Sequence, residues 1–140
     1  MVRIGKWVEG SQPDQPVSQL AKQALAVRLE MVASYLPMAA QKSDEDTEYV
    51  HQLRVATRRA VAAIQVFGDL LPAKRTEKMN KHLRDIRRAA GDARNLDVLV
   101  DQLLKQRQID SDSRRDQLVH WIRHCRQRAQ GPLKKIAEPE

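Results

Sequence analysis

The chain has 140 residues and a formal net charge of +7, which suggests a single, strongly basic domain. Aromatic residues make up only 4% of it, so the core must be aliphatic and rich in alanine, and the single cysteine, Cys125, excludes an internal disulfide framework. The N-terminus has no apolar signal region, and no apolar run approaches the length of a membrane span. We therefore expect a cytoplasmic protein whose partners are polyanions.

Apolar residues recur at helical spacing and glycine is scarce, which predicts an all-α fold. Residues 1–16 are an irregular lead-in with two glycines and two prolines, and residues 17–140 form the expected helical domain. The first helix is expected to end at Leu36, because Pro37 disfavours helical geometry in the residue before it.

A second helix is expected from about Asp44 to Leu71, with Ser43 acting as its cap. A third helix should run from about Ala73 to Leu104, with a bend or a close contact at Gly91. A fourth follows a polar segment and breaks near Gly131-Pro132. Four amphipathic helices with short connections predict an antiparallel four-helix bundle.

The positive charge is concentrated in the second and third helices. Residues 51–100 carry eleven Lys or Arg against five Asp or Glu, whereas the first fifty residues have a net charge of −2. His51, Arg54 and Arg58 fall within roughly 60° of one another on a helical wheel, opposite the apolar stripe. No acidic residue occurs between Glu48 and Asp69 to neutralise this row. A solvated helix face remains the alternative interpretation.

The third helix repeats this pattern, because Lys81, Arg84 and Arg88 have the same spacing as His51, Arg54 and Arg58. Two such rows side by side would form a wide cationic surface for the phosphates of a flexible polymer. Arg59 points about 80° away from His51 on the wheel, so it lies at the edge of this surface or pairs with a neighbouring helix.

Catalytic and metal-binding patterns are not found in the sequence, which contains neither a nucleophile motif nor a phosphate-binding glycine loop. His120 and His124 share a helix face, but no third ligand accompanies them. Asp97 and Asp101 have a spacing that could hold a divalent cation, yet an ion pair of Arg94 with Asp97 is the preferred interpretation. We expect a non-enzymatic protein with no metal and no cofactor.

Two stretches resemble the signatures of the conserved histidine α-helical domain (CHAD) family. These are YVHQLRVATRR at residues 49–59, followed by Phe67 and Leu70-Leu71-Pro72, and LRDIRRAAGDARNLDV at residues 83–98. The resemblance implies an all-helical fold that binds inorganic polyphosphate and is associated with polyphosphate granules. Its signature positions fall on His51, Arg54, Arg58, Arg59 and Arg84, and the helical wheel adds Lys81 and Arg88.

The sequence departs from the family pattern in two respects. Asn95 stands where the family usually has Asp, which weakens a local ion pair or cation site. The family usually has two four-helix halves around a basic channel, and the resemblance covers only the first half. The chain is therefore expected to be a fragment, or a half-domain that associates with a second copy when polyphosphate bridges the two.

Three hypotheses follow for the function. The first is a non-enzymatic module that binds polyphosphate, with localisation in the cytoplasm and at polyphosphate granules. The alternative is a nucleic-acid-binding helical module that uses the same basic surface. A polyphosphatase ranks last, because the sequence has no convincing acidic cluster for metal ions.

Overall fold

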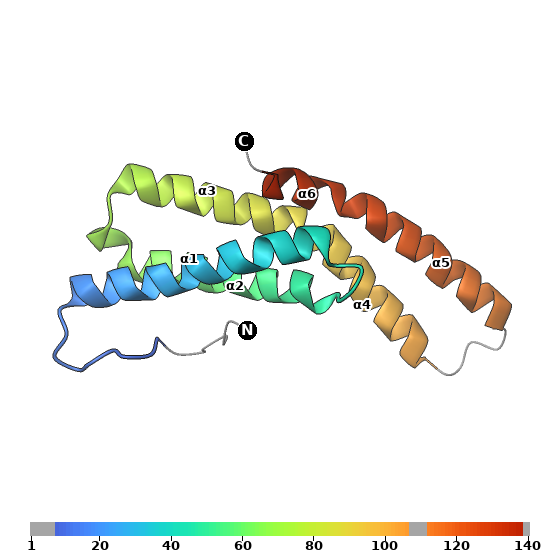
Figure 1. The fold of residues 1–140 in the computed structure, drawn as a ribbon, viewed down its shortest axis with the longest axis horizontal. Coiled ribbons are helices and arrows are strands. Elements are labelled where there is room, and N and C mark those ends of the chain that lie inside the picture. Colours follow the sequence, from blue (N-terminus) through green and yellow to red (C-terminus); the bar gives the residue numbers. More distant parts are fainter. Residues whose placement is uncertain (1–7, 107–111, 139–140) are drawn as a thin grey trace.

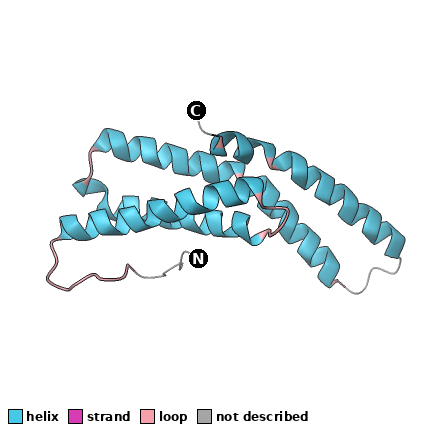
Figure 2. Ribbon diagram, in the orientation of Figure 1, coloured by secondary structure: helices cyan, strands magenta, loops and turns pink. Residues whose placement is uncertain are grey.

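All regular secondary structure in the described part of the chain is helical (Figure 2). The computed structural model describes residues 8–106 and 112–138. Its elements, in chain order, are α1 (Val17–Gln41), α2 (Glu48–Phe67), the short 3₁₀ helix η1 (Gly68–Leu70), α3 (Ala73–Ala89), α4 (Gly91–Lys105), α5 (Asp112–Ala129) and α6 (Gly131–Ala137). The predicted all-α class is confirmed.

The helices form four rods (Figure 1). Helices α1 and α2 are one rod each, whereas α3 continues into α4, and α5 continues into α6, with one change of direction in each case. Helices α1 and α2 lie side by side, α3 packs against α2, and α6 packs against α1 and α3. Helix α4 diverges from the direction of α3 and pairs with α5 (Figure 1). The predicted helical bundle is thus confirmed. Within the described ranges, no helix is long and apolar enough to cross a membrane.

The core consists of the aliphatic and small side chains that the helical periodicity predicts. On α2, Leu53, Ala60 and Ile64 are at most 1% exposed, and they share one buried cluster with Ala39 of α1 and Leu83 of α3. Small alanine side chains let neighbouring helix backbones approach closely and pack densely. Helix α2 therefore buries one face between α1 and α3, and His51, Arg54 and Arg58 lie away from this buried face.

The predicted end of the first helix at Leu36 is wrong, because α1 continues through Pro37 to Gln41. A proline inside a helix costs about 3 kcal/mol or more, since it removes a hydrogen bond and crowds the preceding turn. The residues after it offset this cost through tertiary packing. Ala39 and Ala40 are at most 1% exposed, and the buried side chain of Gln130 donates a hydrogen bond to the carbonyl oxygen of Ala39.

The second helix is shorter than predicted at both ends. It begins at Glu48, whose N–H donates to the carboxylate of Asp46 at 2.8 Å, and its last turn tightens into η1. Ser43 is therefore not the helix cap. It is 2% exposed, and its carbonyl oxygen accepts a hydrogen bond from Arg126 of α5.

The predicted bend at Gly91 separates α3 from α4. Backbone hydrogen bonding continues through it, because Ala90 N–H donates to Ile86 at 3.0 Å and Arg94 N–H donates to Ala90 at 3.3 Å. The chain thus changes direction without a loop. Arg94 lies in the first turn of α4, one turn after the last residues of α3. The expected break near Gly131-Pro132 is also present, between α5 and α6.

Candidate functional site

An open, positively charged cavity of about 620 Å³ lies where α2 passes the bend between α3 and α4. We call it the basic cavity. Helix α2 contributes four of its lining residues, and α3 and α4 contribute one each: His51, Arg54, Val55, Arg58, Arg87 and Arg94. The structure therefore brings His51, Arg54 and Arg58 together, as the helical wheel predicts, and adds two arginines from the neighbouring helices.

Arg54 is held in place by the end of α3. Its Nη1 atom donates a hydrogen bond to the carbonyl oxygen of Arg87 at 3.1 Å. This oxygen belongs to the last turn of α3, where carbonyl groups lack partners within the helix. A Cβ atom at Gly91 would lie 3.2 Å from the same nitrogen, so a side chain there would crowd it. Gly91 thus provides the predicted close contact, and its partner is Arg54.

The cations of the basic cavity are not neutralised by carboxylates. Among the residues that the structure describes, no Asp or Glu lines the cavity, and none of its arginines forms an ion pair. Four guanidinium groups and one imidazole thus face a common space that is open to solvent. Such groups repel one another at short range, and a bound polyanion would relieve this repulsion.

The packing does not bring the predicted row on α3, which is Lys81, Arg84 and Arg88, to one site. Arg84 lines an adjoining hollow between α3 and η1, together with Thr76, Asn80 and the carboxylate of Glu77. Lys81 and Arg88 are exposed and line neither that hollow nor the basic cavity. Arg87 faces α2 in their place.

A signal for the α3 and α4 contribution is present in the sequence. Arg84, Arg87, Gly91 and Arg94 are spaced three, four and three residues apart, which is one helical stripe that continues through the bend. The wheel applied to α3 alone favours Lys81 and Arg88, which lie on the other side of Arg84.

Arg59 does not line the basic cavity. It lies near Arg28 of α1, and burial together with the smaller effect of the Arg59 charge lowers the pKa of the Arg28 guanidinium. The Nη1 atom of Arg59 is buried, and no described residue forms a hydrogen bond with it. Arg59 therefore lies toward the neighbouring helix, but it forms no ion pair there with a described residue, as the sequence-based alternative of a pair with that helix would require.

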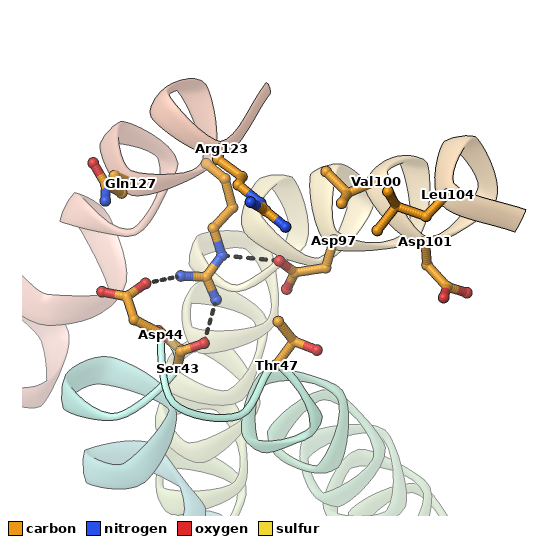
Figure 3. A pocket seen from close by; sticks show the side chains of 10 residues that line it. Ser43, Asp44, Thr47, Asp97, Val100, Asp101, Leu104, Arg123 and Gln127 are labelled. Atoms are coloured by element: carbon orange, nitrogen blue, oxygen red, sulfur yellow. Dashed lines mark hydrogen bonds and ion pairs between the residues drawn. The ribbon is translucent and has the colours of Figure 1, made fainter. Parts of the chain in front are cut away.

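Asp97 pairs with Arg126 of α5 and not with Arg94, contrary to the preferred interpretation of the sequence. Arg126 Nε donates to Asp97 at 2.9 Å, Nη1 donates to Asp44 at 2.6 Å, and Nη2 donates to the Ser43 carbonyl at 3.0 Å (Figure 3). We call this arrangement the Arg126 clamp. It joins α4 and α5 to the loop before α2, and so it fixes the helix that carries Arg94.

Burial raises the pKa of the Asp97 carboxyl, and the hydrogen bond from Arg126 and the charges of Arg126 and Arg94 only partly oppose this effect. Asp101, one turn further, pairs with Lys105 at 2.6 Å on the exposed surface. In the described ranges, no group of three or more His, Cys, Asp or Glu side chains is arranged to hold a metal ion.

Comparison with known proteins gives one match. A family model described as the CHAD domain matches residues 23–139, from the first turns of α1 to beyond the end of α6. No curated protein and no solved structure gives a significant match. The matched range contains all the residues of the basic cavity and of the Arg126 clamp.

Proposed function

The chain belongs to the CHAD domain family, and from this premise we propose that it binds inorganic polyphosphate through the basic cavity without catalysing a reaction. The family is known in connection with polyphosphate, which supplies the ligand class. One observation supports the proposal most strongly. Arg54, Arg58, Arg87, Arg94 and His51 converge on one open space with no described carboxylate among them.

The residue types suit a phosphate polymer. A guanidinium group is planar, stays charged, and can donate two hydrogen bonds to the oxygens of one phosphate. Arg54 is already oriented by its bond to Arg87, so less side-chain entropy is lost when it binds. His51 would act as one more donor to phosphate oxygens, with no role as a base.

The polymer would extend beyond the basic cavity along α3. Arg84 lies one turn before Arg87, so it offers the next contact for a chain that leaves the cavity, whereas Glu77 in the same hollow would repel phosphates that go further along α3. Lys81 and Arg88 are exposed on the neighbouring strip and would contribute weaker, solvent-screened attraction. Successive contacts of this kind make affinity rise with chain length, because each further phosphate binds as part of a molecule already held.

Titration with polyphosphates of several defined lengths tests the proposal. We expect saturable binding that strengthens with length and weakens as salt is added. Replacing Arg54, Arg58 and Arg87 with Ala should reduce the affinity at least about a hundredfold, since three charge-assisted contacts are removed. Unchanged binding by this triple variant would show that the site lies elsewhere.

A matched control removes the same charge from a different place. Lys74, Arg75 and Lys78 are exposed near the start of α3 and line neither the basic cavity nor the adjoining hollow. Their replacement by Ala lowers the net charge by the same three units. We expect at most a few-fold loss of affinity, because only long-range attraction is reduced. An equal loss in both triple variants would indicate nonspecific attraction to a basic protein.

Nucleic acid is the competing ligand for the same surface. Base recognition on single strands uses stacking aromatic side chains, and the basic cavity is lined by no Phe, Tyr or Trp, with the imidazole of His51 as its one aromatic ring. We expect polyphosphate to displace DNA or RNA at a much lower phosphate concentration. Displacement in the opposite order would favour the nucleic-acid module.

Two further consequences of the proposal concern activity and localisation. Phosphate release from polyphosphate in the presence of Mg²⁺ or Mn²⁺ would contradict non-catalytic binding. A fluorescently tagged chain should collect at polyphosphate granules, and the Arg54, Arg58 and Arg87 triple variant should not. A triple variant that still reaches the granules would separate granule targeting from the basic cavity.

We further propose that polyphosphate brings a second copy of the domain against the basic cavity. Two such faces repel each other, and a polyanion between them would neutralise both. Light scattering should show a higher mass with long-chain polyphosphate than without it. An unchanged mass at saturating polymer would exclude association.

A further inference from the structure

Helices α4 and α5 form a hairpin that extends beyond the ends of α1 and α2 (Figure 1). This hairpin leaves large apolar side chains in contact with water. Leu99 and Leu118 are 41% and 42% exposed, and Trp121 is 61% exposed. Apolar surface that gathers on one part of a protein marks a site of contact with another molecule.

The exposed apolar residues belong to two helical stripes. Each helix contributes three residues at alternating spacings of three and four, which is the pattern of a seam between packed helices. These residues are Leu96, Leu99 and Leu103 on α4 and Leu118, Trp121 and Cys125 on α5. We call the two stripes together the hairpin face.

Both stripes lie on the side of the hairpin that faces away from the Arg126 clamp. On a helical wheel, each stripe is rotated by roughly 110–130° from the clamp residue of its own helix, which is Asp97 on α4 and Arg126 on α5. The rotation has the same sense along the chain in both helices. Because the helices run antiparallel, the two stripes therefore emerge on one side of the hairpin.

The hydrogen bond from Arg126 to Asp97 sets the register of the two helices. Counted from that bond, each apolar residue of α4 lies within one turn of an apolar residue of α5. The pairs are Leu103 with Leu118, Leu99 with Trp121, and Leu96 with Cys125. The hairpin face thus consists of three apolar layers.

A charged layer closes the hairpin face at the end nearer the main bundle. Asp92 precedes Leu96 by one turn on the same stripe. On α5, Nη2 of Arg128 donates a hydrogen bond to Sγ of Cys125 at 3.9 Å, which brings the guanidinium to the edge of the face. Both charged residues are exposed, and within the described ranges neither forms an ion pair.

We propose that the hairpin face is the contact surface between two copies of this chain. A two-fold axis along the hairpin lays α4 of each copy on α5 of the other, so that four antiparallel helices enclose the apolar layers. The same axis sets Asp92 of each copy opposite Arg128 of the other. A reversed arrangement would set these charges against Leu103 and Leu118 and would bury them without partners.

The charged layer also favours a second copy over a lipid surface. An anionic membrane attracts Arg128 and repels Asp92, whereas a second copy offers each of them an opposite charge. This contact needs no polyphosphate, and it uses a different face from the association across the basic cavity.

The size of the hairpin face determines how tightly two copies associate. Helix α4 has 15 residues and is about 22 Å long, and two helices side by side are roughly 20 Å wide. The face therefore covers roughly 400 Å² per copy in projection, which is at the lower end of specific interfaces. We expect a reversible equilibrium between monomer and dimer.

Sedimentation equilibrium without polyphosphate tests the proposal. We expect the mean mass to rise with concentration from 16.0 kDa, the mass of one chain, toward twice that value. A mass of one chain at every concentration up to about 1 mM would overturn the proposal. Chains that stay monomeric and bind anionic vesicles would instead identify the hairpin face as a lipid-binding surface.

Substitution of an exposed apolar residue locates the contact. Leu99→Glu places one carboxylate from each copy in the apolar layers, and we expect the dissociation constant of the dimer to increase at least about a hundredfold. Val66→Glu is the matched control, because Val66 is 75% exposed on α2, outside the hairpin. It should associate as the parent does. Parent-like association of Leu99→Glu, or equal losses in both variants, would place the contact elsewhere.

A charge exchange tests the two-fold arrangement. Asp92→Arg and Arg128→Asp should each weaken the dimer several-fold, since like charges then meet twice. An equal mixture of the two variants should recover the association of the parent, because every charge in the mixed dimer faces its opposite. A mixture that associates as weakly as its components would contradict the proposed contact. Circular dichroism confirms that each variant is folded, and the absence of polyphosphate makes the outcome independent of the proposed function.

Discussion

The basic cavity and the Arg126 clamp both depend on arginine, yet they place it in opposite environments. Arg126 is 6% exposed and donates to two carboxylates and one carbonyl, so its hydrogen-bonding capacity is largely used within the fold. Arg58, in the basic cavity, is exposed and faces other cations. The comparison shows that carboxylate partners and burial, more than residue type, separate an arginine that holds helices together from one that is available to a ligand.

The largest expected effect comes from breaking the clamp. Arg126→Ala leaves the carboxylate of Asp97 buried without its cation, so we expect the free energy of unfolding to fall by about 3–5 kcal/mol. Denaturant unfolding followed by circular dichroism measures it. Arg123→Ala, on the same helix but exposed, should change stability by less than about 0.5 kcal/mol. If both variants lose a similar free energy of unfolding, the Arg126 clamp does not stabilise the fold in the way described.

The basic cavity offers a sharper comparison between adjacent residues. Arg87 lines the cavity and Arg88 does not, although both are exposed arginines in the last turn of α3. Arg87→Ala keeps the carbonyl that binds Arg54, and we expect it to weaken polyphosphate binding roughly tenfold. Arg88→Ala should weaken it by about twofold or less, through long-range attraction alone. If Arg87→Ala and Arg88→Ala lose affinity equally in a binding titration, the result would favour the row of Lys81, Arg84 and Arg88 predicted from the helical wheel.

A smaller effect should follow from crowding Arg54 without removing it. In Gly91→Ala the new Cβ atom lies 3.2 Å from Nη1 of Arg54, so the guanidinium must shift by a few tenths of an ångström. We expect polyphosphate affinity to fall about two- to threefold, with a change in stability below about 1 kcal/mol. Gly131→Ala is the control, because no atom lies within 4 Å of its added Cβ. Binding that is unaffected by Gly91→Ala would show that the position of Arg54 is not critical.

The smallest effect concerns the pH dependence of the free energy of unfolding, and it arises from Asp97 in the Arg126 clamp. The pKa of Asp97 is raised above its ordinary value of 3.8, so the folded state binds this proton more readily than the unfolded chain. Between these two pKa values, the Asp97 contribution to stability increases as the pH falls. The free energy of unfolding of the parent should therefore rise relative to that of Asp97→Asn as the pH is lowered through this window. A constant difference across the window would contradict the raised pKa.

Much of this architecture follows from local patterns. The apolar spacing on α2 predicts the buried positions of Leu53, Ala60 and Ile64, and the same spacing leaves His51, Arg54 and Arg58 on the opposite face. These predictions succeed because the period of a helix fixes which of its own residues share a face.

Other features depend on contacts between distant segments. The Arg126 bond to Asp44 spans 82 positions, and no spacing rule connects the two residues. Helix α1 continues past Pro37 into a segment that tertiary contacts bury, and Gln130, 91 positions after Ala39, donates to that residue's carbonyl oxygen. In both cases tertiary contacts outweigh a local preference. The preference for a helix cap at Ser43 is outweighed by its burial and by the hydrogen bond from Arg126. The preference for a helix end at Leu36 is outweighed by burial of the residues after it and by the hydrogen bond from Gln130.

The amino-acid sequence by itself determined the helical class, the bend at Gly91, the cationic face of α2 and the resemblance to the family to which the chain belongs. Only the tertiary structure decided which cations meet. It placed Arg87 and Arg94 beside Arg54 and left Lys81 and Arg88 outside the cavity. The physical reason is that periodicity sets directions within one helix, whereas the rotation and bend of α3 and α4 relative to α2 are set by how their buried side chains pack.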